Sequence, residues 1–548
     1  MPLLSVTDYG ARAENKTLVN GISFETESGK ITGIVGESGS GKSITCMGLT
    51  RLLPKSITIS GKVIFEDIHG KTIDLLTCNT DSLRSIRGKE ISYIFQEPMT
   101  ALNPVHTCGY QVEEALSIHQ NLTKKETKQK VLDLFKEVTL PDIERIYSSY
   151  PHQISGGQRQ RVMICMALAN DPRLLIADEP TTALDASVQK SIIDLLVSMV
   201  KKRGMAMLFI SHDLSCLKSV ADSILVMYKG NLVEAGSAAT IFNTPQHPYT
   251  KALMKTRPTY LQADYILPTI PDLISETDQG VFSEKVFTMK PRVKSRVGEI
   301  ILEVKDLEKS FARKKLFGKS LSIQRVLKGI SFDIERGKTM GIVGESGCGK
   351  STLAKILTGL EKPTQGHFHF KKSHSNGVGR QIQMVFQDPF SSLNPSISAG
   401  EAIMEPLWVH GIAQKNTAKQ KALTLLELTG LDESYFYKYP HQMSGGQRQR
   451  VCIARALSLE PSILILDESV SALDVSVQSQ ILNLLKDIQL KLGLTYLFIS
   501  HDLNVVGYMA DTILVLRNGA IEEQGPAIEL ITNPKSEYTR FLINCMYE

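Results

Sequence analysis

Short, largely apolar runs recur along the chain and alternate with stretches that carry apolar residues at helical spacing. The runs at 31–35, 173–177 and 205–210 return in order as 340–343, 463–466 and 495–499. Apolar runs of this length predict strands buried on both faces, as in a parallel sheet. Strands that alternate with helices predict an α/β fold class, and the repetition predicts two tandem domains of that kind.

A glycine-rich loop follows the first buried run of each half. The loops read Gly36-Glu37-Ser38-Gly39-Ser40-Gly41-Lys42-Ser43 and Gly344-Glu345-Ser346-Gly347-Cys348-Gly349-Lys350-Ser351. Helical patterns follow at 44–49 and 352–357, so both loops have the strand–loop–helix context of a P-loop. The glycines let backbone N–H groups surround phosphates, and the helix N-terminus adds partial positive charge. We therefore predict two P-loop NTPase domains that bind nucleotide phosphates. A glycine turn that precedes Lys-Ser by chance is the alternative, and the second copy argues against it.

Two residue types in each loop have a specific role in nucleotide binding. Lys42 and Lys350 can reach the terminal phosphates, and the hydroxyls of Ser43 and Ser351 can bind the Mg²⁺ that accompanies the nucleotide.

The two halves share one register over most of their length. Asp178 and Asp467 lie 289 residues apart, as do His212 and His501. A period this long indicates two homologous domains and not a solenoid. The predicted boundaries are 1–257 for the first domain, 258–298 for a linker and C-terminal extension of that domain, and 299–548 for the second domain with a short C-terminal extension.

Prolines distinguish the predicted linker from the domains. Because Pro258, Pro268, Pro271 and Pro291 interrupt any helix, the segment is a plausible linker. Its apolar residues are expected to pack back on the first domain; these are Leu261, Tyr265, Ile266 and Leu267.

Paired carboxylates end the second buried strand of each half. Asp178-Glu179 and Asp467-Glu468 follow the runs at 173–177 and 463–466. Open α/β sheets bind ligands at the carboxyl ends of their strands. The first acid of each pair suits the Mg²⁺ shell, and the second suits polarising the water that attacks the γ-phosphate. Two solvated acids at a strand end are the alternative interpretation.

A second glycine motif opens a later helix in each half. Ser155-Gly156-Gly157-Gln158 and Ser444-Gly445-Gly446-Gln447 precede helical patterns at 159–169 and 448–458. Glycines at a helix N-terminus can form an anion site, which would be best explained if it faced the γ-phosphate bound by the opposite half. A capped surface helix is the alternative, and the residues alone leave both open.

Composition excludes several classes of protein. The 62 basic and 57 acidic residues are dispersed and give a net charge of only +5, so nucleic acid binding is not implied. No stretch approaches 18 apolar residues, and the first ten residues lack a basic, apolar leader pattern, so neither secretion nor membrane spanning is expected. The eight cysteines form no C-x-x-C pair, which predicts neither a zinc site nor a disulfide framework.

The ordered motifs resemble two complete ATPase domains of the ATP-binding-cassette (ABC) family. They comprise the phosphate loop, Gln96, Ser155-Gly156-Gly157-Gln158, Asp178-Glu179, Ala183-Leu184-Asp185 and His212, repeated as the second loop, Gln387, Ser444-Gly445-Gly446-Gln447, Asp467-Glu468, Ala472-Leu473-Asp474 and His501. The resemblance implies a head-to-tail pair with two ATP molecules between the domains, in which Lys42 works with Ser444 and Lys350 with Ser155. It also implies a helical subdomain in each half, at 109–147 and 400–437.

The same resemblance implies roles for individual residues. Glu179 and Glu468 resemble the catalytic bases, and His212 and His501 resemble residues that contact the γ-phosphate. The glutamines of the family sense Mg²⁺ and water, and an aspartate marks the D-loop; the matching residues are Gln96, Gln387, Asp185 and Asp474.

A narrower resemblance points to the ATPases of peptide and nickel importers. It rests on 95–104 and 386–395, on Tyr-Pro-His-Gln at 150–153 and 439–442, and on 245–250 with a looser copy at 534–539. It implies an ATPase subunit that is peripheral on the cytoplasmic face of the inner membrane. Its partners would be two integral-membrane permease subunits and, indirectly, a solute-binding protein. Peptides are the first candidate solute, followed by glutathione-like compounds and nickel.

Two rival functions remain at this stage. A soluble twin-cassette protein acting on ribosomes or DNA typically joins its cassettes by a long charged helix, whereas prolines occupy that position here. A regulatory protein with inactive cassettes is the other, and the intact Glu179 and Glu468 argue against it.

Two departures from the family pattern carry further expectations. Phe311 occupies the position of the aromatic residue that stacks on adenine, whereas Ala13 holds that position in the first half. We therefore expect the first site to bind ATP less tightly. Some relatives carry a cysteine-rich iron–sulfur segment after one domain, but no cysteine lies between Cys216 and Cys348, so no iron–sulfur cluster is expected.

Overall fold

The computed structural model describes residues 2–14, 16–96, 101–181, 184–277, 281–292, 298–314, 321–371, 378–471 and 473–547. Contacts divide the chain into two compact units. Unit 1 comprises Met1–Leu184, Val188–Lys255 and Leu273–Lys285, and unit 2 comprises Asp185–Ser187, Thr256–Asp272 and Val286–Glu548.

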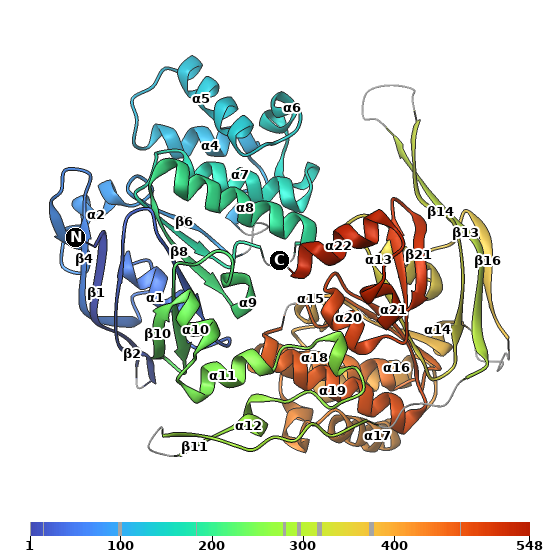
Figure 1. Ribbon diagram of the computed structural model, residues 1–548. Helices are drawn as coiled ribbons and strands as arrows, with labels where there is room; N and C mark the ends of the chain where they lie inside the picture. Colours follow the sequence, from blue (N-terminus) through green and yellow to red (C-terminus); the bar gives the residue numbers. More distant parts are fainter. Residues whose placement is uncertain are drawn as a thin grey trace. The chain divides into compact units, whose positions relative to one another are not determined.

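Unit 1 contains two sheets and a hairpin (Figure 1). Its strands are β1 (Leu4–Ala13), β2 (Lys16–Thr26), β3 (Ile31–Val35), β4 (Ile57–Glu66), β5 (Thr72–Asp74), β6 (Ile91–Ile94), β7 (Leu174–Asp178), β8 (Ala206–Ser211), β9 (Ser223–Tyr228), β10 (Asn231–Ser237), β11 (Ile274–Glu276) and β12 (Phe282–Glu284). The central sheet has the order β10-β9-β3-β8-β7-β6 and is parallel except for β10. β3, β7 and β8 are buried at every position, which confirms the predicted buried strands.

The second sheet of unit 1 is antiparallel, with the order β2-β1-β4-β5. Its apolar residues pack in one cluster with residues of the central sheet and of α1 (Lys42–Leu49), the helix that follows the phosphate loop. The loop is therefore carried between a parallel strand and a helix that is packed into the core.

Helices make up the rest of unit 1, and α4, α5 and α6 gather beyond α7 (Figure 1). This helical layer confirms the predicted helical subdomain. The helices are α2 (Thr80–Ile86), α4 (Cys108–Ser117), α5 (Lys124–Glu137), α6 (Ile143–Ser148), α7 (Gly156–Leu168), α8 (Ala186–Arg203), α9 (Leu214–Leu217), α10 (Ala238–Asn243) and α11 (Pro248–Lys255), with a 3-10 turn η1 (Pro151–Gln153).

Unit 2 repeats the same plan. Its strands are β13 (Ile300–Lys314), β14 (Leu321–Glu335), β15 (Thr339–Val343), β16 (Gln365–Phe370), β17 (Ile382–Val385), β18 (Ile463–Asp467), β19 (Thr495–Ile499), β20 (Thr512–Arg517) and β21 (Ala520–Pro526). The central order is β17-β18-β19-β15-β20-β21, with only β21 antiparallel, and β14-β13-β16 form the antiparallel sheet.

The helices of unit 2 also match those of unit 1. They are α13 (Lys350–Leu357), α14 (Val378–Gln381), α15 (Pro389–Ser392), α16 (Ala399–Val409), α17 (Lys415–Leu428), α18 (Gly445–Leu457), α19 (Val475–Leu492), α20 (Leu503–Met509), α21 (Ala527–Thr532) and α22 (Glu537–Tyr547), with the turns η3 (Glu433–Tyr437) and η4 (Pro440–Gln442). α16, α17 and α18 pack on one another and form the second helical layer.

The packing predicted for the segment after the first domain is wrong. The residues from Thr256 to Asp272, which include η2 (Tyr260–Gln262) and most of α12 (Ile270–Leu273), belong to unit 2. Leu267 is fully buried in the unit 2 core, and its backbone N–H and carbonyl both bind the side chain of Asn483. Leu261 is 73% exposed and packs on neither core. The segment packs on unit 2 because the side-chain amide of Asn483 on α19 satisfies its backbone groups. Hydrophobicity alone did not specify which unit the segment would contact.

The following part of the segment belongs to unit 1. β11 and β12 form an antiparallel hairpin, and Glu276 in β11 accepts hydrogen bonds from Tyr228 and Lys229. The predicted linker is therefore divided between the units: 258–272 and the residues from Val286 onward belong to unit 2, and 273–285 belongs to unit 1.

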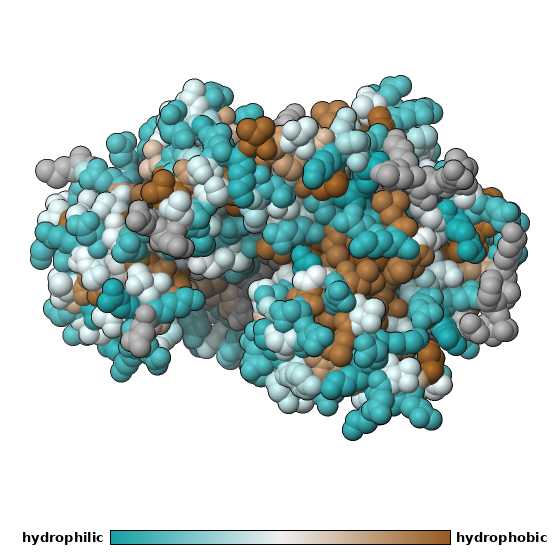
Figure 2. Space-filling view, turned by 90° about the horizontal axis from the view of Figure 1, so that it is seen from below, coloured by the Kyte–Doolittle hydropathy of each residue, from teal (hydrophilic) through white to brown (hydrophobic). Residues whose placement is uncertain are grey.

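Among the residues that the structure describes, no helix is long and apolar enough to cross a membrane. On the face shown in Figure 2, hydrophilic residues cover much of the surface and hydrophobic residues emerge between them.

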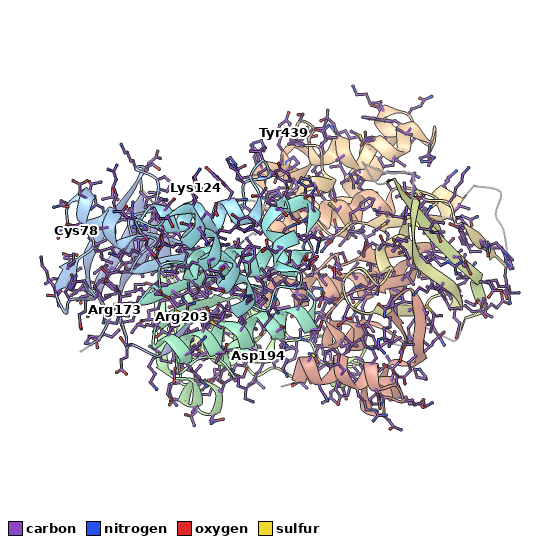
Figure 3. All side chains as sticks on the ribbon, turned by 90° about the horizontal axis from the view of Figure 1, so that it is seen from above. Cys78, Lys124, Arg173, Asp194, Arg203 and Tyr439 are labelled. Atoms are coloured by element: carbon purple, nitrogen blue, oxygen red, sulfur yellow. The ribbon has the colours of Figure 1, made fainter. Side chains whose placement is uncertain are left out.

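An ionic cluster joins the helical layer of unit 1 to α8. Arg203, labelled in Figure 3, is the last residue of α8 and binds Glu137 Oε2 at 2.5 Å and Asp171 Oδ1 at 2.7 Å. Lys202 binds the other oxygen of Glu137 at 2.7 Å. Burial disfavours the charge of Glu137, but the hydrogen bonds from Lys202 and Arg203 outweigh that effect and lower its pKa.

Candidate active sites

The phosphate loop of unit 1 encloses its own lysine. Lys42 is buried, and its Nζ donates to the carbonyls of Gly36 at 2.8 Å and Glu37 at 2.9 Å. A Cβ at Gly36 would lie 2.1 Å from the carbonyl oxygen of Met227, and Gly41 has φ 99° where it caps α1. Only glycine fits at both positions, because one is too close to backbone and the other is left-handed.

The loop of unit 2 has the same geometry. Lys350 Nζ donates to the carbonyls of Gly344 at 2.6 Å and Glu345 at 3.0 Å. A Cβ at Gly344 would lie 2.2 Å from the carbonyl oxygen of Leu516, and Gly349 caps α13 with φ 112°. Each loop therefore presents a buried ammonium and a helix N-terminus at one place, which is an arrangement for binding phosphate.

In unit 1 the first carboxylate touches the loop serine. Ser43 Oγ donates to Asp178 Oδ1 at 3.1 Å, and the Tyr93 hydroxyl donates to Asp178 Oδ2 at 2.9 Å. Burial raises the pKa of Asp178, and these two hydrogen bonds oppose the rise. A hydroxyl and a carboxylate beside a phosphate loop are the oxygen donors that Mg²⁺ takes when phosphates complete its shell. The residues present therefore fit Mg²⁺.

In unit 2 the equivalent carboxylate is less well satisfied. Burial raises the pKa of Asp467, opposed by a hydrogen bond from Ser351. Asp467 Oδ1 is buried without a hydrogen-bond partner among the described residues. Met384, which pairs with Ile465, holds the place that Tyr93, which pairs with Ile176, holds in unit 1. The two sites therefore differ in one hydroxyl on the candidate Mg²⁺ ligand.

The second carboxylate of unit 1 lies between the glutamine and the histidine that the sequence singled out. Gln96 Nε2 donates to Glu179 Oε2 at 2.9 Å, and His212 Nδ1 lies 3.2 Å from the same oxygen. Glu179 has φ 46°, a left-handed conformation that is costly for a residue with a side chain. Such strain persists where the surrounding structure imposes it, and it concentrates at functional sites.

Unit 2 brings the same three residue types together. Gln387 Nε2 donates to Glu468 Oε2 at 2.7 Å, His501 Nδ1 lies 3.7 Å from that oxygen, and Glu468 has φ 47°. Burial disfavours the charge on both partners, yet their mutual attraction lowers the pKa of Glu468 and raises the pKa of His501. The carboxylate is therefore held ionised, as a base that polarises water must be.

The Ser-Gly-Gly-Gln motifs each cap a helix. Ser155 Oγ accepts from Gln158 N at 3.3 Å, and the Gln158 side chain accepts from Ser155 N at 3.1 Å. Ser444 and Gln447 form the same reciprocal pair at α18. These reciprocal bonds are those of a capped helix, which was the alternative interpretation. Anion binding at the N-termini of these helices stays a prediction.

The remaining predicted residues lie at the ends or edges of elements. Asp474 precedes α19 and Asp185 precedes α8. Phe311 lies on β13 with its side chain 38% exposed, and Lys309 Nζ lies 4.8 Å from the ring centroid. Ala183, Ala472 and 97–100, which belong to the predicted motifs, lie outside the described residues.

Sequence reasoning missed Tyr93 as a partner of Asp178. The residue stands three positions before Gln96, and aligning the halves places it opposite Met384. That mismatch was the available signal, but a hydroxyl on the neighbouring strand β6, far from Asp178 in the sequence, carries no local pattern.

The sequence matches two known protein families. The model of the family described as "ABC transporter" matches residues 19–182 and 327–471. A second, described as "Oligopeptide/dipeptide transporter, C-terminal region", matches residues 233–280. The chain belongs to the ABC transporter family, and its two cassettes are ATPase domains.

Characterised relatives align over almost the whole chain. The glutathione import ATP-binding protein GsiA of Salmonella paratyphi A is 41% identical over 537 residues, covering 96% of this chain and 86% of that protein. The peptidoglycan transport ATP-binding protein YejF of Agrobacterium fabrum is 41% identical over 558 residues, covering 99% of this chain and 96% of that protein. These relatives favour a transport ATPase over a twin-cassette protein of ribosomes or DNA.

Among solved structures, the dimeric post-hydrolysis state of the ATP-binding cassette MJ0796 bound to ADP and Pi is 31% identical. It covers 41% of this chain and 99% of its own, with a TM-score of 0.37.

Proposed function

We propose that this chain uses ATP hydrolysis to drive import of a solute, in the first place peptides, through a membrane permease. The match of 233–280 to the oligopeptide and dipeptide transporter region supports this proposal, as do the glutathione and peptidoglycan systems of the relatives. Peptides, glutathione and peptidoglycan fragments share peptide bonds and a carboxylate. Nickel remains the less favoured candidate because neither of these relatives carries a metal in its name.

Each cassette would hold ATP by the same set of residues. The phosphate loop and Lys42 or Lys350 would bind the phosphates, and Phe311 would stack on the adenine in unit 2. Mg²⁺ would be held by Ser43 and Asp178 in unit 1 and by the matching Ser351 and Asp467 in unit 2. When bound, this ion would neutralise charge that develops on the phosphates.

The catalytic step would depend on a second set of side chains. Glu179 and Glu468 would polarise the attacking water, Gln96 and Gln387 would hold that water and the Mg²⁺ shell, and His212 and His501 would contact the γ-phosphate. The contact of one carboxylate oxygen with both glutamine and histidine, present twice, is the single observation that carries this proposal. It allows glutamine or histidine to orient the base.

The two cassettes would close on two ATP molecules and reopen after hydrolysis. Ser155 would complete the site of Lys350, and Ser444 would complete the site of Lys42, with Asp185 and Asp474 beside them. Such closure is a general means by which nucleotide binding drives domain motion.

The membrane partners would be two permease subunits, and a solute-binding protein would act through them. The chain would lie peripherally at the cytoplasmic face of the inner membrane. The helical layer that contains α16 would receive the permease loops, and Trp408 on that helix is 42% exposed.

The test uses the Glu179→Gln, Glu468→Gln double variant. With ATP, it should retain nucleotide without turnover and co-purify with two multi-span permeases from detergent-solubilised native membranes. The matched control is Glu144→Gln, Glu433→Gln, which changes exposed carboxylates at equivalent positions of the two units. The control should retain ATP turnover.

Two outcomes of this experiment would contradict the proposed function. Turnover that survives in the Glu179→Gln, Glu468→Gln variant would overturn the assigned bases. Ribosomal or DNA-repair proteins in place of permeases would overturn the transport function and leave the ATPase assignment standing.

A further inference from the structure

The Pro-Tyr-Thr and Glu-Tyr-Thr segments that end 245–250 and 534–539 contact the phosphate loops. Tyr249 is fully buried at the start of α11, and its hydroxyl accepts a hydrogen bond from Glu37 N at 3.3 Å. Tyr538 in α22 is 6% exposed, and its hydroxyl accepts from Glu345 N at 3.2 Å. The two bonds join residues 212 and 193 positions apart, so they are tertiary contacts that occur in both units.

A carboxylate from the central sheet places each tyrosine. Glu234 in β10 accepts from Gln246 N at 2.7 Å and from His247 N at 3.1 Å, which fixes the turn before α11. His247 Nδ1 then accepts from Tyr249 N at 3.2 Å.

The turn before α22 is built in the same way. Glu523 in β21 accepts from Lys535 N at 2.9 Å and from Ser536 N at 3.0 Å, and Ser536 Oγ accepts from Tyr538 N at 3.1 Å. The sequences of the two turns differ, but both deliver a tyrosine hydroxyl to the same backbone N–H of the loop.

The loop residue that each tyrosine binds is held through both its backbone N–H and its backbone carbonyl. In unit 1 the Glu37 carbonyl accepts from Lys42 Nζ, and the Glu37 N–H donates to Tyr249. In unit 2 Lys350 and Tyr538 hold Glu345 in the same way. A bound phosphate attracts the lysine ammonium and can break its bond to the loop carbonyl. The hydrogen bond from the loop N–H to the tyrosine hydroxyl can persist.

We propose that Tyr249 and Tyr538 are positioning residues that hold each phosphate loop in its anion-binding shape and thereby link the C-terminal helix of each unit to nucleotide affinity. This inference rests on the proposed binding of ATP at these loops. The two rings have different neighbours: the ring centroids of Tyr228 and Tyr249 lie 4.4 Å apart, whereas Arg517 Cζ lies 4.7 Å from the ring centroid of Tyr538. The feature that the two units share is therefore the hydroxyl.

The hydroxyl is suited to this role because it stays neutral. Burial raises the pKa of Tyr538 to about 12, so near pH 7 the phenol keeps its proton and accepts from the N–H with an oxygen lone pair.

The test measures nucleotide affinity at one site at a time. In a Lys350→Ala parent, which leaves the unit 1 loop intact, Tyr249→Phe removes the hydroxyl and keeps the ring. We expect the Kd for a fluorescent ATP analogue with Mg²⁺ to rise about three- to tenfold, as for loss of one hydrogen bond. In the otherwise unchanged chain, the KM for ATP should rise while kcat at saturating ATP is retained.

The matched control is Tyr228→Phe in the same parent. It removes, from the ring next to Tyr249, a hydroxyl that donates to Glu276 Oε2 in β11 at 3.1 Å. A purely structural effect would lower the melting temperature in both variants and leave the Kd of both alike. Equal Kd values for Tyr249→Phe and Tyr228→Phe would overturn the inference.

The second site gives an independent test. In a Lys42→Ala parent, Tyr538→Phe should weaken binding by a similar factor, whereas Tyr508→Phe should not, because the Tyr508 hydroxyl binds the Tyr265 carbonyl and Asn483. If neither parent binds the analogue while the unchanged chain also fails to bind it, the proposed function fails. If the parents bind and the tyrosine variants match their controls, only the further inference fails.

Discussion

Gly48, in the helix that carries Lys42 and Ser43, offers a test of how the core sets the phosphate loop. A Cβ at Gly48 would lie 1.6 Å from the Tyr9 hydroxyl oxygen and 2.8 Å from its Cζ. Tyr9 is fully buried in β1, so its ring has no room to withdraw. The second unit solves the same packing problem differently, because Ile356 replaces Gly48 as the seventh residue of α13 and the smaller Leu307 replaces Tyr9.

The substitution Gly48→Ala should therefore destabilise unit 1. Replacing a helical glycine by alanine stabilises a helix by up to about 1 kcal/mol, whereas overpacking a closed core costs about 1–3 kcal/mol. The contact of 1.6 Å places Gly48→Ala at the upper part of that range, so we expect a net loss of about 1–2 kcal/mol. Tyr9→Leu alone should also destabilise, by about 1–3 kcal/mol, because it leaves a cavity.

The double variant Tyr9→Leu, Gly48→Ile recreates the pair found in unit 2. The introduced isoleucine fills the space that the tyrosine leaves. The double variant should therefore lose less free energy of unfolding than the Tyr9→Leu and Gly48→Ile variants lose together, by more than about 1 kcal/mol.

Differential scanning calorimetry of the full chain, with fluorescence of Trp408 as the reporter for unit 2, measures this coupling. Trp408 is the only tryptophan in the sequence and lies in α16. The variants should shift a thermal transition that the Trp408 signal does not follow. Additive losses in the double variant would refute the reasoning, because they would mean that Tyr9 and Gly48 do not share one packing space.

Three further predictions follow from single contacts. Leu267→Ala should lower the stability of unit 2 by about 2–4 kcal/mol, since it empties a fully buried site, and calorimetry with the Trp408 signal measures it. Glu137→Gln should cost about 1–2 kcal/mol at pH 7, because the amide keeps one acceptor oxygen but presents an NH₂ group, which cannot accept, to Lys202 or Arg203. The folded pKa of Glu137 is lowered, so this stability is present above the unfolded pKa and is lost as the pH falls through the folded pKa. Urea unfolding at pH 7 and at acidic pH should show the difference between the two proteins shrink. Tyr93→Phe should raise the Mg²⁺ concentration for half-maximal ATPase activity about three- to tenfold, because the carboxylate it contacts loses a donor that stabilises the charged form.

Controls for these three predictions come from exposed positions. Leu261→Ala changes a side chain that is 73% exposed and should leave stability unchanged. If Leu267→Ala and Leu261→Ala changed the stability equally, the assigned packing would be contradicted. Glu144→Gln changes a carboxylate on α6 that is 64% exposed, so it should leave the stability at pH 7 almost unchanged, because exposed ion pairs contribute little. Tyr110→Phe, on α4 and 46% exposed, should leave the Mg²⁺ dependence unchanged.

Much of the fold could be predicted because its signals are local. The buried strands appear as apolar runs, and the glycines of the phosphate loops are required by backbone geometry within a few residues of each other. The placement of Glu179 and Glu468 followed from the same kind of signal, since a carboxylate after a buried strand must lie at the carboxyl edge of the sheet. Repetition of the pattern in the second half made each of these inferences stronger.

Other features depend on which surfaces meet in space. The sequence showed that the segment around Leu267 is apolar, but only the folded chain places it on α19 of unit 2, because hydrophobic burial has no direction and the Asn483 amide supplies the specificity. Tyr93 and Tyr249 likewise look like ordinary core aromatics until the sheet brings one to Asp178 and α11 brings the other to Glu37. The amino-acid sequence by itself determined the two cassettes and the placement of their candidate catalytic residues, whereas the tertiary structure decided which distant hydroxyls and amides complete them.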